Sequence, residues 1–297
     1  MSDQTTISFA NLKLPEDGVA VVFAEEGPKL SPGAKDLDKR AKRLLSRAAE
    51  ISGFKGKRES SVDLLAPAGL KFSRLVLLGI GNPAKYGAED WLNLGGLIRG
   101  QLSGREGDTA HVVVQGIGGD IHAADVAKVA LGLMLRGYKF KKYKTSARKK
   151  GNGASDANER SLKRIVVHCA DPKAATKAFG WGRAIVNGVT LARDLVNEPA
   201  NVLGPAEFAS RAKELSKLGV GVEVLTPKTL QRLGMNALLA VGQGSVRPSH
   251  AVVMQWRGAG PRGGDPVVFV GKGVTFDTGG ISLKPAAGME DMKGDMA

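Results

Sequence analysis

The chain has 297 residues, of which 42% are hydrophobic and 24% charged, a composition typical of a folded protein with a sizeable core. At ~150 residues per domain, this length predicts two domains. No apolar run approaches the ~20 residues that a membrane helix needs, and the N-terminus lacks the apolar stretch of a secretory signal. The single cysteine, Cys169, excludes an internal disulfide and fits a reducing compartment, so we expect a cytoplasmic protein.

The formal net charge of +14 leaves two interpretations open. A strongly basic chain can bind an acidic partner such as nucleic acid or a membrane surface. The same charge can also be a solubilising surface, or an excess that acidic residues outside the present sequence would partly cancel. We favour the second interpretation, because net charge reports on association and not on fold or chemistry.

Strand-like and helix-like patterns alternate in the first part of the chain. Short apolar runs predict strands at residues 7–10, 18–24, 62–66, 74–79, 111–115 and 162–170. Apolar residues at helical spacing predict helices at residues 33–51, 91–102 and 123–135. A Pro-Glu-Asp-Gly turn joins the first two strands. This alternation favours an α/β layered domain, which we expect to span residues 1–170.

A basic run interrupts this pattern before the last of these strands. Residues 138–150 hold seven basic side chains in thirteen positions, interleaved with Tyr138, Phe140 and Tyr143. Basic and aromatic residues together can grip a nucleic acid. A solvated loop beside an ordinary aromatic anchor has the same composition.

The second domain is expected at residues 171–297, entered through a long helix over residues 174–197 that ends before Pro199. Further helices are predicted at residues 205–218 and 227–233, and strands at residues 221–225 and 249–255.

Two common kinds of site are excluded by pattern. Three glycine-rich loops begin like a phosphate cradle, but G-x-G-x-x-G fails in each because its third glycine is replaced by Ala84, Ile121 or Phe276. His168 and Cys169 lie in an apolar strand without a CxxC or HxxxH companion, which indicates core packing. The other histidines are isolated in sequence.

The last thirty-odd residues combine a buried-strand pattern at residues 267–270 with glycines and charges. Asp277 and Asp295, with Glu290 and Asp291 nearby, can supply hard oxygen ligands for two divalent cations that activate a water. Lys272 beside such cations can lose its proton and coordinate, and Lys284 can polarise a carbonyl. A surface loop with ordinary ion pairs explains the same spacing, so the residues alone leave both readings open.

A resemblance favours the first reading. Residues 270–285 (VGKGVTFDTGGISLKP) and 288–297 (GMEDMKGDMA) closely resemble the metal-binding core of the leucyl aminopeptidase family, the cytosol-type aminopeptidases with two zinc or manganese ions. Residues 192–205 (ARDLVNEPANVLGP) are similar to the family's entry into its catalytic domain. Residues 138–144 and 240–245 also match in place and order.

The resemblance implies a macro-like N-terminal α/β domain followed by an α/β aminopeptidase catalytic domain, assembled as a homohexamer. The implied activity releases N-terminal residues, leucine preferred, from peptides with a free N-terminus. Lys272 and Asp277 would bind the two Mn²⁺ or Zn²⁺ ions, Asp277 bridging both, and Asp295 would bind one ion and receive the substrate's α-amino group. Lys284 would polarise the scissile carbonyl and stabilise the gem-diolate, and Met292 would line the pocket for the first side chain. All five residues are therefore expected at the substrate.

One departure qualifies this resemblance. The family's later Asp-x-Glu-x-Arg segment, which carries the remaining carboxylate ligands and an arginine, is not among these residues. We interpret the chain as C-terminally truncated and expect it to be inactive, or unfolded in its catalytic half, by itself. The alternative function is that of a nucleic-acid-binding protein that uses its basic surface.

Overall fold

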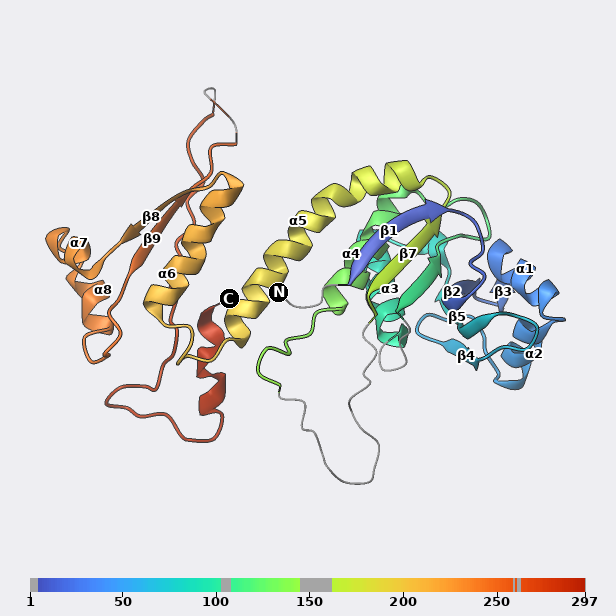
Figure 1. Cartoon of the computed structure of the whole chain (residues 1–297), viewed down its shortest axis with the longest axis horizontal. Coiled ribbons are helices and arrows are strands. Elements are labelled where there is room, and N and C mark those ends of the chain that lie inside the picture. Colours follow the sequence, from blue (N-terminus) through green and yellow to red (C-terminus); the bar gives the residue numbers. More distant parts are fainter. Residues whose placement is uncertain (1–4, 103–107, 145–161, 259, 261–262, 297) are drawn as a thin grey trace. The chain divides into compact units, whose positions relative to one another are not determined.

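The structure, a computed structural model, describes residues 5–102, 108–144, 162–258, 260 and 263–296. The chain divides into two compact units, Met1–Val189 and Thr190–Ala297, and the long helix α5 (Pro172–Asn197) runs across the division (Figure 1). Each unit is described by itself.

The first unit is built on a mixed sheet with the strand order β1-β7-β6-β2-β5-β4. The bounds are β1 Thr6–Asn11, β2 Gly18–Glu25, β4 Ser61–Leu65, β5 Phe72–Gly81, β6 Thr109–Val113 and β7 Arg164–Cys169. Neighbours pair in parallel except β4, which runs antiparallel to β5, and the short β3 (Lys29–Leu30), which pairs antiparallel with β2. β1 and β2, although joined by a turn, are therefore separated by β7 and β6.

Helices cover both faces of this sheet. In β2, Val19, Val21 and Phe23 face one core, and the residues between them face the other. The first core is closed by α3 (Ala88–Leu102) and α4 (Ala123–Arg136), and the second by α1 (Pro32–Arg40) and α2 (Leu44–Ile51). Because β2 is buried on both faces, it reads as a continuous apolar run.

The predicted helix over residues 33–51 is two helices. The chain breaks at Lys42 and Arg43, whose φ values of 51° and 64° lie in the left-handed region and end α1. Asp38 holds the new helix start, because its carboxylate accepts hydrogen bonds from the backbone N–H and the hydroxyl of Ser46. The spacing of the apolar residues alone does not reveal such a break in the helix.

The second unit contains a two-stranded antiparallel sheet of β8 (Gly221–Leu225) and β9 (Ala251–Gln255). Its helices are α6 (Pro205–Lys213), α7 (Pro227–Arg232) and α8 (Asn236–Val241), with the 3₁₀ segments η3 (Glu214–Leu218) and η5 (Met289–Met296). α6 packs on both strands. No helix among the described residues is both long enough and apolar enough to cross a membrane.

Candidate active site

The predicted strand at residues 267–270 is wrong. These residues form no regular element, and the side chains of Val267, Val268, Phe269 and Val270 are 73–95% exposed. A strand is held by its ladder of backbone hydrogen bonds, and within the described residues the only partners in this unit are β8 and β9, which pair with each other. Asp277 therefore follows an unpaired segment rather than the end of a strand.

Asp277 and Lys284 nevertheless meet. The Nζ of Lys284 donates to Oδ2 of Asp277 at 3.0 Å, and the backbone N–H of Gly279 donates to Oδ1 at 2.8 Å. The loop closes through the N–H of Lys284, which donates to the carbonyl of Thr278 at 2.9 Å. Gly279 has φ +94°, and a Cβ there would lie 2.2 Å from the Ser282 carbonyl oxygen. Glycine at this position thus allows the turn that brings the lysine to the carboxylate.

This contact favours the ionised form of Asp277. The hydrogen bond from Lys284 is the largest of the effects that hold its pKa below the ordinary value, followed by the Gly279 N–H and the charge of Lys284. Lys272 contributes a smaller lowering through its charge, so it lies close enough for its field to matter. An ionised carboxylate in a partly exposed loop is the form that binds a divalent cation.

Met292 also reaches this loop. Its sulfur accepts a hydrogen bond from Nζ of Lys284 at 3.1 Å, which places η5 against the Asp277 loop. Glu290 and Asp291, at the start of η5, are exposed. Asp295 lies in the last turn of η5, and its side chain is outside the described part of the structure. Of the five predicted residues, the structure thus brings Lys284 into direct contact with Asp277 and Met292.

A complete metal centre does not form from the described residues alone. Nowhere among them do three His, Cys, Asp or Glu side chains gather closely enough to hold a cation. Asp277 fits such a centre as an ionised oxygen ligand, and the charge of Lys272 contributes to the lowering of its pKa. The remaining ligands of a two-metal site would have to come from elsewhere. A separate open cleft of about 400 Å³, lined partly by Leu203, Glu207 and Arg211, includes none of the predicted residues.

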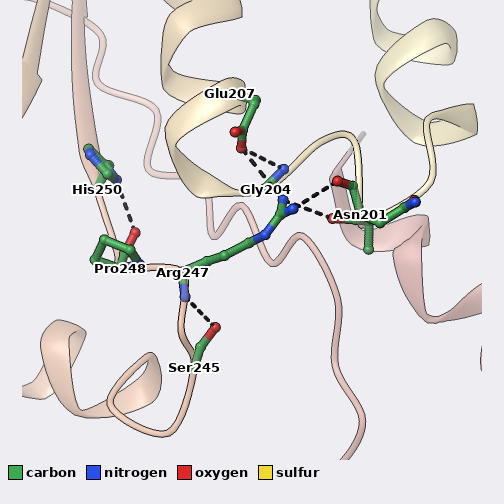
Figure 2. A network of polar contacts seen from close by, with 8 residues as sticks. Asn201, Gly204, Glu207, Ser245, Arg247, Pro248 and His250 are labelled. Carbon is green, nitrogen blue, oxygen red and sulfur yellow. Dashed lines mark hydrogen bonds and ion pairs between the residues drawn. The ribbon is translucent and has the colours of Figure 1, made fainter.

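The segment between α5 and α6 is tied to η5 and to the segment before β9. Lys293 Nζ donates to the carbonyl of Asn197 at 3.1 Å. Arg247 donates to the carbonyls of Ala200 and Asn201 at 3.1 and 2.8 Å (Figure 2). The ANVLGP portion of the quoted motif is therefore a connection held by its backbone carbonyls. The sequence pattern flagged this segment but gave no role to Arg247 or Lys293.

Sequence reasoning also missed a histidine pair in the first unit. Nδ1 of His111 lies 3.0 Å from Nε2 of His168, whose Nδ1 lies 3.1 Å from the carbonyl oxygen of Asn11. That carbonyl accepts only, so His168 carries its proton on Nδ1, and His111 donates to the bare Nε2. Burial lowers the pKa of both rings, and for His111 the neighbouring His168 adds to the lowering. Cys169 is buried as predicted, which raises the pKa of its thiol to about 11.

Comparison with known proteins identifies the family to which this chain belongs. The sequence matches two family models, the N-terminal domain of the cytosol aminopeptidase family over residues 21–147 and its catalytic domain over residues 190–297. This chain belongs to the cytosol aminopeptidase family. The Asp277 loop, Met292 and Arg247 all lie within the match to the family's catalytic domain.

The relatives are longer than this chain. Probable cytosol aminopeptidases of Chelativorans sp. and Rhodopseudomonas palustris are 46% and 48% identical over all of the chain, which covers 58% of each relative's length. Among solved structures, the bottromycin maturation enzyme BotP in complex with Mn is 27% identical with a TM-score of 0.68, over 95% of this chain and 53% of that one. A tomato leucine aminopeptidase mutant shares the fold at 23% identity and a TM-score of 0.67, over 85% of this chain and 51% of that one.

The structure describes only the first part of the basic run. Its last part, residues 145–150, lies outside the described residues, and the described part ends with Lys144. Phe140 and Tyr143 pack ring to ring with centroids 5.9 Å apart, and Lys142 lies over the Tyr143 ring. Two of the interleaved aromatic side chains therefore contact each other, as in the aromatic-anchor interpretation.

Proposed function

We propose that this chain forms part of a metal-dependent aminopeptidase that releases N-terminal residues, leucine preferred, from peptides with a free N-terminus. The observation that carries the proposal is the contact of Lys284 with Asp277 and Met292, in a loop that the family's catalytic-domain model matches. A carboxylate kept ionised beside a lysine that can turn to a carbonyl is what peptide hydrolysis needs from the protein.

The cofactor would be two divalent ions, Mn²⁺ or Zn²⁺, held by Lys272, Asp277 and Asp295. When bound, these ions would supply an activated water and polarise the peptide. BotP, with Mn in its solved structure, supports a divalent metal in this fold.

The side chains of the protein have separate tasks in this scheme. Lys284 donates from Nζ to the oxygen of the scissile carbonyl, where negative charge develops. Met292, already in contact with Lys284, borders the pocket for the first side chain. Asp295 accepts hydrogen bonds from the α-amino group, which restricts cleavage to a free N-terminus.

The activity is proposed for a full-length protein of the relatives' size, assembled as a cytoplasmic homohexamer. The 297-residue chain alone is expected to be inactive, because its described residues gather too few ligands for two metal ions. Incubation of the purified chain with leucine amide and Mn²⁺ tests this expectation, and measurable release of leucine would contradict it.

Replacement of Lys284 tests the central assignment. In the full-length protein, Lys284→Ala should lower kcat by about 10²–10³-fold, the usual effect of removing one transition-state donor. Lys228→Ala, which removes an exposed lysine at the start of α7, serves as the matched control and should leave kcat unchanged. An unchanged kcat in Lys284→Ala would show that Lys284 does not contact the reacting carbonyl.

A further inference from the structure

We propose that Arg247 and Lys293 are positioning residues that hold residues 197–204 from two sides and thereby set η5, with Met292, against Lys284. The consequence for catalysis rests on the proposed aminopeptidase function, whereas the contacts themselves do not. Nothing in the family matches or in the sequence motif assigns either residue a role.

Arg247 binds the connection through its backbone. Its Nη1 and Nη2 donate to the carbonyls of Ala200 and Asn201, and its Nη1 also lies 3.6 Å from Oε2 of Glu207 (Figure 2). The same Glu207 oxygen accepts from the backbone N–H of Gly204 at 3.1 Å. One planar guanidinium thus joins the segment after α5 to the first turn of α6, which a lysine, with a single ammonium, cannot reproduce.

The space beside Gly204 gives independent evidence for this position of the Arg247 guanidinium. A Cβ on Gly204 would lie 2.4 Å from Nη1 of Arg247 and 2.9 Å from Oε2 of Glu207. The φ of Gly204 is −95°, which any residue adopts, so glycine is needed here for space and not for backbone conformation. A side chain at this position would displace the guanidinium without changing any charge.

Lys293 binds the same segment at its first residue. Its ammonium donates to the carbonyl of Asn197, the last residue of α5, where the helix dipole favours a cation. Lys293 follows Met292 directly in η5, a short 3₁₀ segment. Because 3₁₀ hydrogen bonds have poorer geometry than those of an α-helix, this long-range bond helps to hold η5, and with it Met292, in place.

These contacts form a continuous path from Arg247 through residues 197–204 to Lys293, Met292 and Lys284. This series of contacts predicts an effect at a distance. Replacing Arg247 should speed hydrogen exchange in η5, although the Arg247 side chain makes no hydrogen bond or ion pair with η5 among the described residues. If Arg247 stabilised only the segment that it binds, its replacement would speed hydrogen exchange in residues 198–204 and leave exchange in η5 unchanged.

Hydrogen exchange followed by mass spectrometry, on the full-length protein with Mn²⁺, distinguishes these cases. Arg247→Met and Gly204→Ala should each speed exchange in peptides covering residues 198–204 and 289–296, and Lys293→Met should do so in residues 289–296. Arg257→Met and Gly264→Ala are the matched controls. Within the described residues, the Arg257 side chain donates only to Oε1 of Gln255, at 3.5 Å, and a Cβ at Gly264 meets nothing within 4 Å. Faster exchange confined to residues 198–204 in Arg247→Met would overturn the proposed path.

Kinetics with leucine amide test the consequence for catalysis. A displaced Met292 and Lys284 should lower kcat by about 10- to 100-fold in Lys293→Met, with a smaller change in KM, and Lys293→Arg should recover most of the loss because it keeps a long cationic donor. Wild-type kcat in Lys293→Met would overturn the positioning role. A full-length wild-type protein without aminopeptidase activity would instead refute the proposed function. The hydrogen-exchange data would still test whether Arg247 and Lys293 position η5.

Discussion

The crossing of α3 and α4 depends on two glycines, and replacing one of them should damage the first unit. A Cβ on Gly95 would lie 2.0 Å from the carbonyl oxygen of Val129, and one on Gly132 would lie 1.9 Å from that of Leu92. Both obstacles are backbone atoms inside helices, which cannot rotate away as a side chain can. Gly95→Ala must therefore push the helices apart until this distance grows from 2.0 Å to at least 3.0 Å.

The expected magnitude follows from two opposing effects. Alanine is a better helix former than glycine by ~1 kcal/mol, which favours the variant. Overpacking a close-packed contact costs ~1–3 kcal/mol, and rigid backbone puts this case at the upper end or beyond. We expect the free energy of unfolding to fall by about 2 kcal/mol, a shift of ~1 M in urea midpoint at a slope of ~2 kcal/mol/M. Gly96→Ala, on the same helix with nothing within 4 Å, should gain up to ~1 kcal/mol.

Urea unfolding followed by tryptophan fluorescence measures both variants. Trp91, in α3, is 7% exposed, whereas Trp181 and Trp256 are 76% and 69% exposed. In a Trp181→Phe, Trp256→Phe background, the signal therefore reports the first unit alone. Equal midpoints for Gly95→Ala and Gly96→Ala would refute the reasoning, because only the close approach to α4 distinguishes the two positions.

Two further predictions concern buried charge in the same unit. Because burial lowers the pKa of His111 and His168 in the folded state, the unfolded chain binds more protons near pH 6, and the free energy of unfolding should fall as the pH drops from 7.5 through ~6.5. The urea midpoints of wild type and His111→Phe at pH 7.5 and 5.5 check this, and an equally large pH difference in the variant would argue against the pair. Asp63→Ala should cost ~1–3 kcal/mol, because Arg74, only 5% exposed, would lose its two hydrogen bonds to that carboxylate. The double variant with Arg74→Met should recover part of the loss in the same unfolding assay, and additive losses would contradict the pairing.

The elements that could be predicted are those whose pattern is local. The alternation of apolar runs and helical spacing located nearly every strand and helix of the first unit, because each buries a face fixed by its own sequence. The order of the strands was not available from this pattern. β1 pairs with β7 across more than 150 positions, in a register that aligns Ala10 with His168.

The histidine pair illustrates the same limit. His111 and His168 are 57 positions apart and were interpreted as unrelated. Parallel pairing of β6 with β7 aligns His168 with Val113, two residues from His111 and on the same face. Only that register brings the two rings together, so a search for short metal-binding or catalytic spacings could not find them.

The candidate site combines a loop that its own sequence determines with a preceding segment that has no strand partner among the described residues. The loop from Asp277 to Lys284 is closed by its own backbone and by Gly279, and it forms although the segment before it is unpaired. Residues 267–270 have the composition of a central strand but no partner among the described residues, so their apolar side chains stay in solvent. Lys272 follows that segment after Gly271. Of the expected metal ligands that the structure describes, Asp277 is thus held by local contacts, whereas Lys272 follows a segment that has no strand partner among the described residues.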